Sequence, residues 1–483
     1  MTLNPKKSLM ILCATQLLLW TALPTLFFSA PPLDVVENLL WGQEWQWGYY
    51  KHPPMQAWLS ELAVTLSGGH IFGLYLLAQM SVVVIYLVLF DLGRMLKNEQ
   101  VGLLAAGSYA LVYYASIPTP EFNANSVLAL FSALAVWYFY RALEHDRLIN
   151  WLLLALFLAA SAYAKYAALF IFLAMFFVLL AYQPYRAALC AKNFWLSAML
   201  CLVLLIPHFM WLVQNDFLPF TYAASRGAPI QGVERFILPL KFLITQVLDH
   251  ALVIIILLFF IPVLRKPQLE ARQRLFLYAL AFLPLTLLAG IAGLFGMALK
   301  DMWGYGLVTF IALFIGLCAQ DLCQHKRFVL LQKIVLAILI LLPLLYIGLT
   351  TAQPYFGQKP IRAAWPAAQI NQELQAVWKE HQSSAAPELV AGPTWEAGLA
   401  SYVLPDRPQA LVLKANAKAC SGFENNPWVT QKIFNSKPVL FVWSGAAQRF
   451  QGCGAFSAQG LITVKKGSYD FVINWAIRDA KLP

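Results

Sequence analysis

Charged side chains are scarce in this chain of 483 residues. Only 12% of the residues are Asp, Glu, Lys or Arg, whereas 60% are hydrophobic, and the mean hydropathy is +0.64. A soluble domain carries about twice that share of charge, so the composition excludes an ordinary soluble protein. Apolar runs of about 20 residues recur along roughly the first 350 positions, and each is long enough to cross a bilayer. We therefore expect an all-α polytopic membrane protein.

The sequence also lacks the motifs of several common enzyme classes. It has no P-loop, no GxSxG nucleophile motif, no HExxH zinc motif and no paired CxxC. The formal net charge is +11, but no run of Lys and Arg and no recognised nucleic-acid motif accompanies it. The excess charge is typical of the positive-inside bias of membrane proteins, and we expect no nucleic-acid partner.

The apolar runs predict about eleven membrane spans. The first follows Lys6 and Lys7 and is longer than the apolar core of a signal peptide, so we expect it to be retained. The predicted spans are 8–29, 70–90, 101–117, 124–141, 149–163, 166–182, 194–213, 240–264, 275–298, 303–320 and 329–350.

The distribution of Lys and Arg predicts the orientation. With the amino terminus inside, the inner connections hold about 15 of these residues and the outer connections about 6. An odd number of spans places the tail outside. We expect a transmembrane domain over 1–350 and a small extracytoplasmic α/β domain over 351–483. The tail contains a helical run, NQELQAVWKEHQ, and strand-like runs: PELVAGP, QALVLKA, KPVLFVWS and LITVKKGSYDFVINWAI.

The tail holds two of the seven cysteines, Cys420 and Cys453, and the other five lie in or beside the predicted spans. In an oxidising compartment these two cysteines could pair. A single pair of cysteines is weak evidence, so both the paired and the free state stay open.

The loop after the first predicted span, PPLDVVENLLWGQEWQWGYYKHPPMQAW, supports two interpretations. In the first, Asp34 and Glu37 form a capping box, and the tryptophans and tyrosines place an amphipathic helix at the membrane interface. In the second, Asp34 and Glu37 share a helix face just outside the membrane, and Lys51 and His52 join them. A carboxylate near cations suits transfer from a lipid phosphate, because one group takes a proton and the others stabilise the leaving phosphate.

This loop resembles the first outer loop of the GT-C glycosyltransferases of family 39, which include protein O-mannosyltransferases and the bacterial transferase that adds aminoarabinose to lipid A. Further segments match family members in order and approximate spacing: PTPEFNANSVLALFSALAVWYFYRAL, SAYAKYAALF, PHFMWLVQNDF and ALKDMWG. The resemblance covers about residues 1–350 and implies a polyprenyl-phosphate sugar donor, an outward-facing site and an inverting single displacement.

The resemblance assigns roles in the opening loop. Asp34 matches the acid that opens the family's loop, as catalytic base or acceptor binder, and Glu37 matches the second acid less closely. Many relatives have an acid before the His/Lys-Pro-Pro step, and in some it helps to hold a divalent metal. This chain has Lys51 there, which leaves a metal unknown and offers a positive charge for the donor phosphate instead.

Other polar residues near the span ends are candidates for the same site. Lys165 lies between two apolar runs, where a lysine costs about 2.5–3.5 kcal/mol on the insertion scale, so a functional role is favoured over snorkelling. We expect the donor phosphate to be bound by Lys51, His52, Lys165, Tyr166, Arg226 and Lys300. We expect sugar or acceptor to be bound by Glu121, Asn123, Asn125, His208, Trp211 and Asp301. Helix capping is the alternative for Glu121, Asn123 and Asn125, and an ordinary structural role is the alternative for His208.

The sequence therefore predicts a membrane glycosyltransferase that moves a sugar from a polyprenyl-phosphate, such as undecaprenyl phosphate, to an envelope acceptor. No soluble nucleotide-sugar domain is evident, so we expect the donor's lipid tail to lie between spans. We expect the acceptor to be lipid A, another glycolipid, a glycan or a protein. By resemblance we expect a bacterial inner membrane with a periplasmic site. Two alternatives are a flippase or transporter of lipid-linked sugars, and a protein O-mannosyltransferase.

Overall fold

The computed structural model describes residues 4–225, 230–259, 264–324, 327–357, 359–416 and 418–480. The chain divides into two compact units. The first, the membrane unit, comprises Met1–Ala22, Lys51–Gln56 and Tyr75–Leu344. The second, the C-terminal unit, comprises Leu23–Tyr50, Ala57–Leu74 and Leu345–Pro483, so two segments of the opening region belong with the tail.

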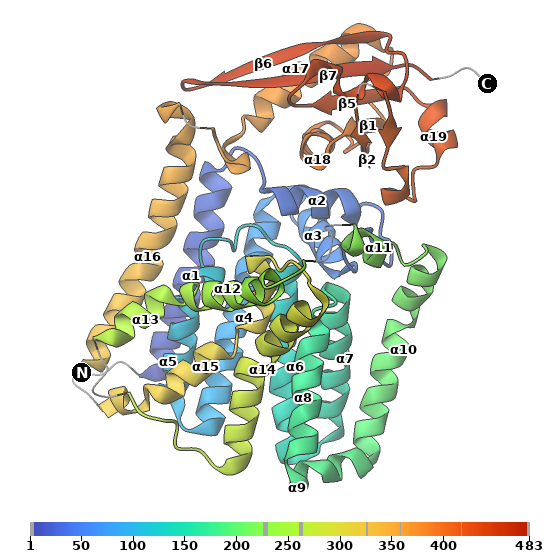
Figure 1. The fold of residues 1–483 in the computed structure, drawn as a ribbon. Coiled ribbons are helices and arrows are strands. Elements are labelled where there is room, and N and C mark those ends of the chain that lie inside the picture. The colour runs from blue at the N-terminus through green and yellow to red at the C-terminus, as the bar shows by residue number, and fades with distance from the viewer. Residues whose placement is uncertain are drawn as a thin grey trace. The chain divides into compact units, whose positions relative to one another are not determined.

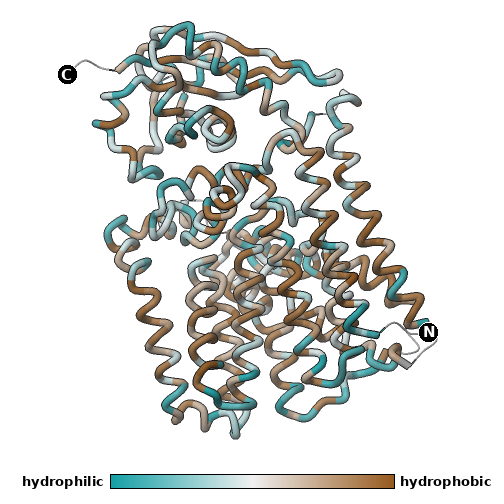
Figure 2. Tube along the Cα trace, turned by 180° about the vertical axis from the view of Figure 1, so that it is seen from behind, coloured by the Kyte–Doolittle hydropathy of each residue, from teal (hydrophilic) through white to brown (hydrophobic). Residues whose placement is uncertain are grey.

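The membrane unit is helical, and its apolar residues run continuously along its helices (Figure 2). Helix α10 packs on α7, α7 on α6, and α14 on α8 (Figure 1). The helices assigned to it are α1 (Pro5–Phe27, which continues into the C-terminal unit), α4 (Phe72–Leu96), α5 (Glu99–Ala110), α6 (Ala124–His145), α7 (Leu148–Ala164), α8 (Ala168–Ala181), α9 (Gln183–Arg186), α10 (Lys192–Gln214), α11 (Leu218–Ala224), α12 (Glu234–Leu248), α13 (Ala251–Leu258), α14 (Ala271–Phe295), α15 (Ile311–Cys318) and α16 (Phe328–Ala352). Short 3-10 helices include η1 (Tyr113–Ala115), η2 (Ala187–Cys190), η4 (Asp301–Leu307) and η5 (Gln320–Gln324).

By length and composition, six helices of the described residues can cross a membrane: α1, α4, α6, α10, α14 and α16. Three bent pairs raise this to nine: α8 with residues Gln183–Cys190, α12 with α13, and η4 with α15. The predicted span over 101–117 corresponds to α5, which ends at Ala110. The chain turns there, and the Tyr113 N–H donates to the carbonyl of Asp249 in the α12–α13 break. The polytopic helical class is confirmed, but six to nine is fewer than the eleven spans predicted, because α5 and α7, with 12 and 17 residues, are shorter than a full span.

Two helix ends show how local sequence sets the boundaries. Asn123 caps α6, because its side chain accepts hydrogen bonds from the backbone N–H groups of Asn125 and Ser126. In return, the Ser126 hydroxyl accepts from the backbone N–H of Asn123. The capping interpretation is confirmed for Asn123. Helix α14 ends at Phe295, and the next residue, Gly296, adopts the left-handed conformation with φ of 65°. A Cβ there would lie 2.4 Å from the carbonyl oxygen of Ile230, so glycine is required at this position.

The C-terminal unit is built on a five-stranded sheet in the order β2-β1-β5-β7-β6, where β1 is parallel to β2 and β5, and β7 is antiparallel to β5 and β6 (Figure 1). The predicted α/β class and each predicted strand run are confirmed. The elements are α2 (Leu33–Gly42), α3 (Met55–Leu66), η6 (Gln353–Phe356), η7 (Arg362–Ala364), α17 (Ala367–His381), β1 (Leu389–Gly392), α18 (Thr394–Val403), β2 (Gln409–Val412), β3 (Lys414–Ala415), β4 (Cys420–Ser421), η8 (Phe423–Asn425), α19 (Gln431–Ser436), β5 (Val439–Trp443), η9 (Ala447–Cys453), β6 (Ala458–Lys466) and β7 (Tyr469–Arg478).

Successive side chains of β5 point to opposite faces of the sheet, and each face packs into its own hydrophobic core. Leu440 and Val442 pack with α17 and α18 on one face, and Phe441 and Trp443 pack with the α19 segment on the other. Because side chains alternate along a strand, a fully apolar run is expected when both faces are covered. This explains why KPVLFVWS contains no polar residue between Val439 and Trp443.

Cys420 and Cys453 form a disulfide that joins β4 to η9, so the pairing left open by the sequence is confirmed. We expect Cys420→Ser to destabilise the C-terminal unit by about 2–4 kcal/mol, because the bridge restricts the unfolded chain over 33 residues. Thermal unfolding of the full chain in detergent measures this. The control is Cys190→Ser, which removes an exposed free cysteine. An unchanged unfolding temperature for Cys420→Ser would contradict the expectation.

Candidate functional site

Lys165 lies at the break between α7 and α8, where its backbone is extended. Its Nζ donates to the Oδ1 of Asn125, at the start of α6, at 2.5 Å. The same Nζ lies 5.7 Å from the centroid of the Trp303 ring in η4, a cation–π distance. Two separate elements therefore orient one partly buried ammonium group at the ends of apolar helices.

Lys51 and His52 from the opening region join this lysine. The pKa of His52 is lowered from 6.5 to about 3, first by burial and then by the positive charges of Lys165 and Lys51. The imidazole is therefore neutral at physiological pH, in the field of two cations. A place with two ammonium groups and a neutral ring that donates one N–H is suited to a phosphate-like anion.

The lowered pKa of His52 predicts an acid sensitivity of the fold. The unfolded chain takes up a proton at His52 near pH 6.5, but the folded chain does so only near pH 3. Stability contributed by the neutral His52 is therefore lost as the pH falls below 6.5. We expect acidification to about pH 4 to lower the unfolding temperature of the wild type more than that of His52→Gln. Exposed His70→Gln is the control, and equal acid sensitivity of wild type and His52→Gln would count against this account.

The next residue, Tyr166, extends the cluster to α10. Its hydroxyl lies 3.2 Å from Nε2 of His208, and the His208 ring is stacked parallel to Trp211 at 6.3 Å between ring centroids. Both His208 and Trp211 are buried. Because Lys165 and Tyr166 are adjacent, the lysine cluster and the histidine–tryptophan pair form one continuous site, which we call the lysine–histidine site: Lys51, His52, Asn125, Lys165, Tyr166, His208, Trp211 and Trp303.

The other predicted ligands lie around this site in different ways. Lys300 precedes η4 and is exposed. The carbonyl oxygen of Asp301 accepts hydrogen bonds from the Tyr114 hydroxyl and the Gln246 side chain, so its backbone is fixed. Glu121 lies just before the α6 cap and near Tyr113. Arg226 falls outside the described residues.

Several residues of the region escaped the sequence analysis. The Tyr163 and Phe220 rings pack on His208 and Tyr166 respectively. The Trp303 ring lies within cation–π distance of Lys165. Aromatic residues are common in membrane helices, so these carried no distinct signal. Asp249 did carry a signal in the sequence, because it lies within the predicted span 240–264 and a carboxylate within an apolar run is costly.

Asp34 and Glu37 belong to the C-terminal unit, on α2. The predicted capping box is wrong: the helix begins at Leu33, its N-cap is Pro32, and no side chain caps it. Asp34 instead occupies the first turn, and Glu37 is 7% exposed. The interpretation of this segment as a helix resting on the membrane is also wrong, because residues 35–42 are buried within the protein. The predicted common face of Asp34 and Glu37 is retained, since both lie in one helix three residues apart.

The lysine–histidine site does not suit a divalent metal ion. Among the residues that the structure describes, no group of three or more His, Cys, Asp or Glu side chains is arranged to hold one. The positive charges of Lys51 and Lys165 act on His52 and would repel a cation there.

Comparison with solved structures decides the fold. Two crystal structures of ArnT from Cupriavidus metallidurans match: the apo state with a TM-score of 0.59 over 97% of each chain, and the complex with undecaprenyl phosphate with a TM-score of 0.62 over 96% of this chain and 97% of that one. Both are 12% identical to this chain. The chain therefore has the fold of these structures, the GT-C fold.

Sequence comparisons agree with this GT-C assignment over part of the chain. Residues 51–211 match the family described as dolichyl-phosphate-mannose-protein mannosyltransferase. The lipid A galacturonosyltransferase RgtD of Rhizobium johnstonii is 23% identical over 185 residues, which cover 38% of this chain and 39% of that protein. The chain thus matches about two fifths of the length of that relative. The segment 51–211 contains most of the lysine–histidine site of this GT-C protein.

Proposed function

We propose that this GT-C protein transfers a sugar from a polyprenyl-phosphate donor to an acceptor at the membrane surface. The observation that carries the proposal is the lysine–histidine site, which gathers two lysines and a neutral imidazole at the ends of apolar helices. A lipid-linked donor combines an anionic phosphate with a long apolar tail. Its phosphate fits the cations, and its tail fits the hydrophobic helices beside them.

In this mechanism the donor phosphate is held by Lys51, Lys165 and the His52 N–H. The acceptor hydroxyl oxygen attacks the anomeric carbon of the sugar, and the bond from that carbon to the phosphate oxygen breaks. The configuration inverts, and polyprenyl phosphate leaves with its new charge stabilised by the two ammonium groups. Lys300 and Arg226 are further candidates for this charge stabilisation.

Asp34 takes the proton of the acceptor hydroxyl in the proposed reaction, and Glu37 supports or orients it. This assignment rests on the resemblance of the α2 segment to the first outer loop of family 39. Glu121, Asn123, Asn125, His208, Trp211 and Asp301 remain candidates for sugar or acceptor binding. Of these, Asn125, His208 and Trp211 have contacts in the lysine–histidine site.

For the donor and acceptor we propose undecaprenyl-phosphate-linked sugar and an envelope lipid of the lipid A class. The first is supported by the ArnT structure bound to undecaprenyl phosphate, and the second by the relative named as a lipid A galacturonosyltransferase. We place the protein in a bacterial inner membrane with its C-terminal unit in the periplasm. The Lys and Arg asymmetry and the Cys420–Cys453 disulfide support this side, because disulfides persist in oxidising compartments.

Mass spectrometry of envelope lipids, glycans and glycoproteins from cells with and without the protein tests the proposal. We expect one sugar-sized mass on a lipid only when the protein is present. The purified protein should then transfer that sugar from its polyprenyl phosphate to the isolated acceptor. A modified protein in place of a lipid would replace the acceptor we propose. Movement of the donor across vesicles without any transfer would favour a flippase and overturn the proposal.

A further inference from the structure

Other parts of the C-terminal unit contact helix α2 and the residues just before it at three points. Before the helix, the backbone N–H groups of Ser29 and Ala30 donate to the carbonyl of Ala363. Within it, Val36 packs on Gly398 of α18 so closely that a Cβ on Gly398 would lie 2.5 Å from the valine Cγ1. At its end, Arg407 reaches the carbonyl of Leu39. These contacts lie within one compact unit.

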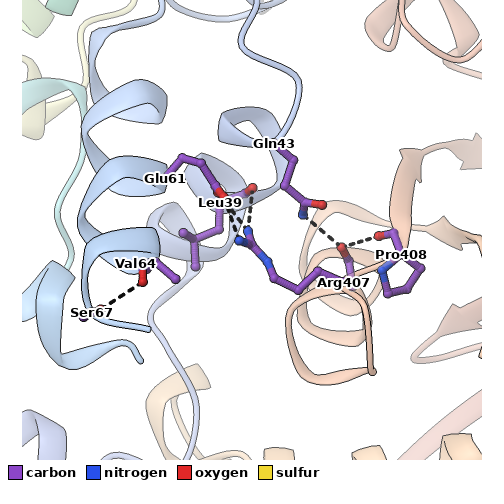
Figure 3. A network of polar contacts seen from close by, with 8 residues as sticks. Leu39, Gln43, Glu61, Val64, Ser67, Arg407 and Pro408 are labelled. Carbon is purple, nitrogen blue, oxygen red and sulfur yellow. Dashed lines mark hydrogen bonds and ion pairs between the residues drawn. The ribbon is translucent and has the colours of Figure 1, made fainter. Parts of the chain in front are cut away.

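The Arg407 contact is the most specific of the three (Figure 3). Its guanidinium forms two parallel hydrogen bonds to Glu61 of α3, Nη1 to Oε1 at 2.8 Å and Nη2 to Oε2 at 2.9 Å. The same Nη2 donates to the Leu39 carbonyl oxygen at 3.3 Å. That carbonyl belongs to the last turn of α2, where carbonyls lack helical partners and a positive charge is favourable. Arg407 therefore links the last turn of α2 to the middle of α3 through one planar group.

Close packing between α2 and α3 makes this link geometrically strict. Gly42 ends α2 against α3, and a Cβ at Gly42 would lie 2.6 Å from the Cβ of Glu61 and 2.7 Å from the carbonyl oxygen of Ala57. Two polar pairs join the end of α2 to the sheet side of the unit: Gln43 with Ser401 of α18, and Glu44 with Gln409 of β2. The Arg407 guanidinium thus contacts two helices that are closely packed on each other.

Several features of this arrangement lower the stability of the fold. Asp406 and Arg407 both have left-handed backbones, with φ of 62° and 46°, although neither is glycine. The Nε of Arg407 is buried without a hydrogen-bond partner in the part of the chain that the structure describes. The Glu61 side chain is only 10% exposed, and a buried ion pair is weak evidence for stability because both charges lose their hydration. Such costs are typical of residues that fix a geometry.

We propose that Arg407 is a positioning residue that acts through α2 on Asp34, so that the C-terminal unit sets the placement of the acid used in transfer. The inference rests on the proposed function, because Asp34 is the base of that reaction. Asp34 is five residues from Leu39 in the same helix, so displacement of the helix end moves the carboxylate. A displacement of about 1 Å can lower a rate by about a hundredfold.

Two measurements on the full-length protein test this. In Arg407→Gln we expect kcat to fall by about 10- to 100-fold with the donor KM unchanged. Hydrogen–deuterium exchange should rise in residues 33–42 but remain unchanged in β5 and β7. Arg407→Lys, which keeps the charge without the planar pair, should give an intermediate kcat. Lys437→Gln is the matched control: it breaks the exposed Lys437–Glu388 pair of the same unit and should leave kcat and α2 exchange at wild-type values.

The outcomes separate the two proposals. Wild-type kcat in Arg407→Gln would overturn the positioning role, and so would unchanged exchange of α2. Increased exchange throughout the sheet would also overturn it, because Arg407 would then stabilise the whole unit. If the wild-type protein transfers no sugar but Arg407→Gln selectively loosens α2, the proposed reaction fails and the control of α2 by Arg407 stands.

Discussion

Asp34→Asn is expected to abolish sugar transfer almost completely while the protein inserts and folds normally. The amide has nearly the same size as the carboxylate, and it can still accept a hydrogen bond, but it cannot take a proton. A positioned general base contributes about a hundred- to ten-thousand-fold to a rate, so kcat should fall by that factor. The measurement is transfer from a purified polyprenyl-phosphate sugar to the acceptor identified by mass spectrometry.

The control for this variant is Asp470→Asn, which makes the same chemical change at an exposed position of β7. It should retain wild-type kcat and unfolding temperature. Asp34→Glu keeps the basic group but displaces it, and we expect a smaller loss than for the amide. Full turnover in Asp34→Asn would remove Asp34 from the mechanism and leave the base to be sought elsewhere, with buried Glu37 tested next.

Much of the membrane unit could be predicted because hydropathy reports directly on burial in lipid. The long helices α4, α6, α10 and α14 coincide with predicted apolar runs. The breaks could not be predicted in the same way. The α12–α13 break, bent by 58°, lies where the Asp249 carbonyl accepts from Tyr113, and a hydropathy profile contains no information about that partner. Helix α3 was missed because its 12 residues are too short for a span.

In the candidate site, too, some residues could be predicted from the sequence and others could not. Lys165 could be predicted because a charge between apolar runs is costly and needs a reason. Its neighbour Trp303 could not, because a tryptophan near a span end has a common structural explanation. Arg407 was beyond sequence reasoning altogether: its partner Glu61 is 346 positions away, and neither residue lies in a recognisable motif. Only the folded chain brings a turn after α18 to the end of α2.

The lysine–histidine site leads to the second large expected effect. In Lys165→Met the side chain keeps much of its length and apolar stem but loses the charge that we propose stabilises the leaving phosphate. We expect kcat to fall by about 10²- to 10³-fold, as when a preorganised electrostatic contact to a transition state is removed. Donor binding should weaken too, because the phosphate is already charged in the ground state. Both quantities can be measured with the purified protein and its polyprenyl-phosphate sugar.

Lys165→Met also separates function from structure, because methionine suits a membrane interior better than lysine does. If Lys165 only filled space, the variant would be at least as stable as the wild type and would keep its activity, which would contradict the phosphate role. If the lysine stabilises the leaving group, stability is retained while transfer is lost, and Lys165→Arg restores part of it through its permanent charge. Exposed Lys97→Met makes the same substitution outside the lysine–histidine site and should transfer sugar at the wild-type rate. Loss of activity in both variants would point to net charge or insertion instead, so the comparison between Lys165 and Lys97 decides whether this particular ammonium group acts on the donor.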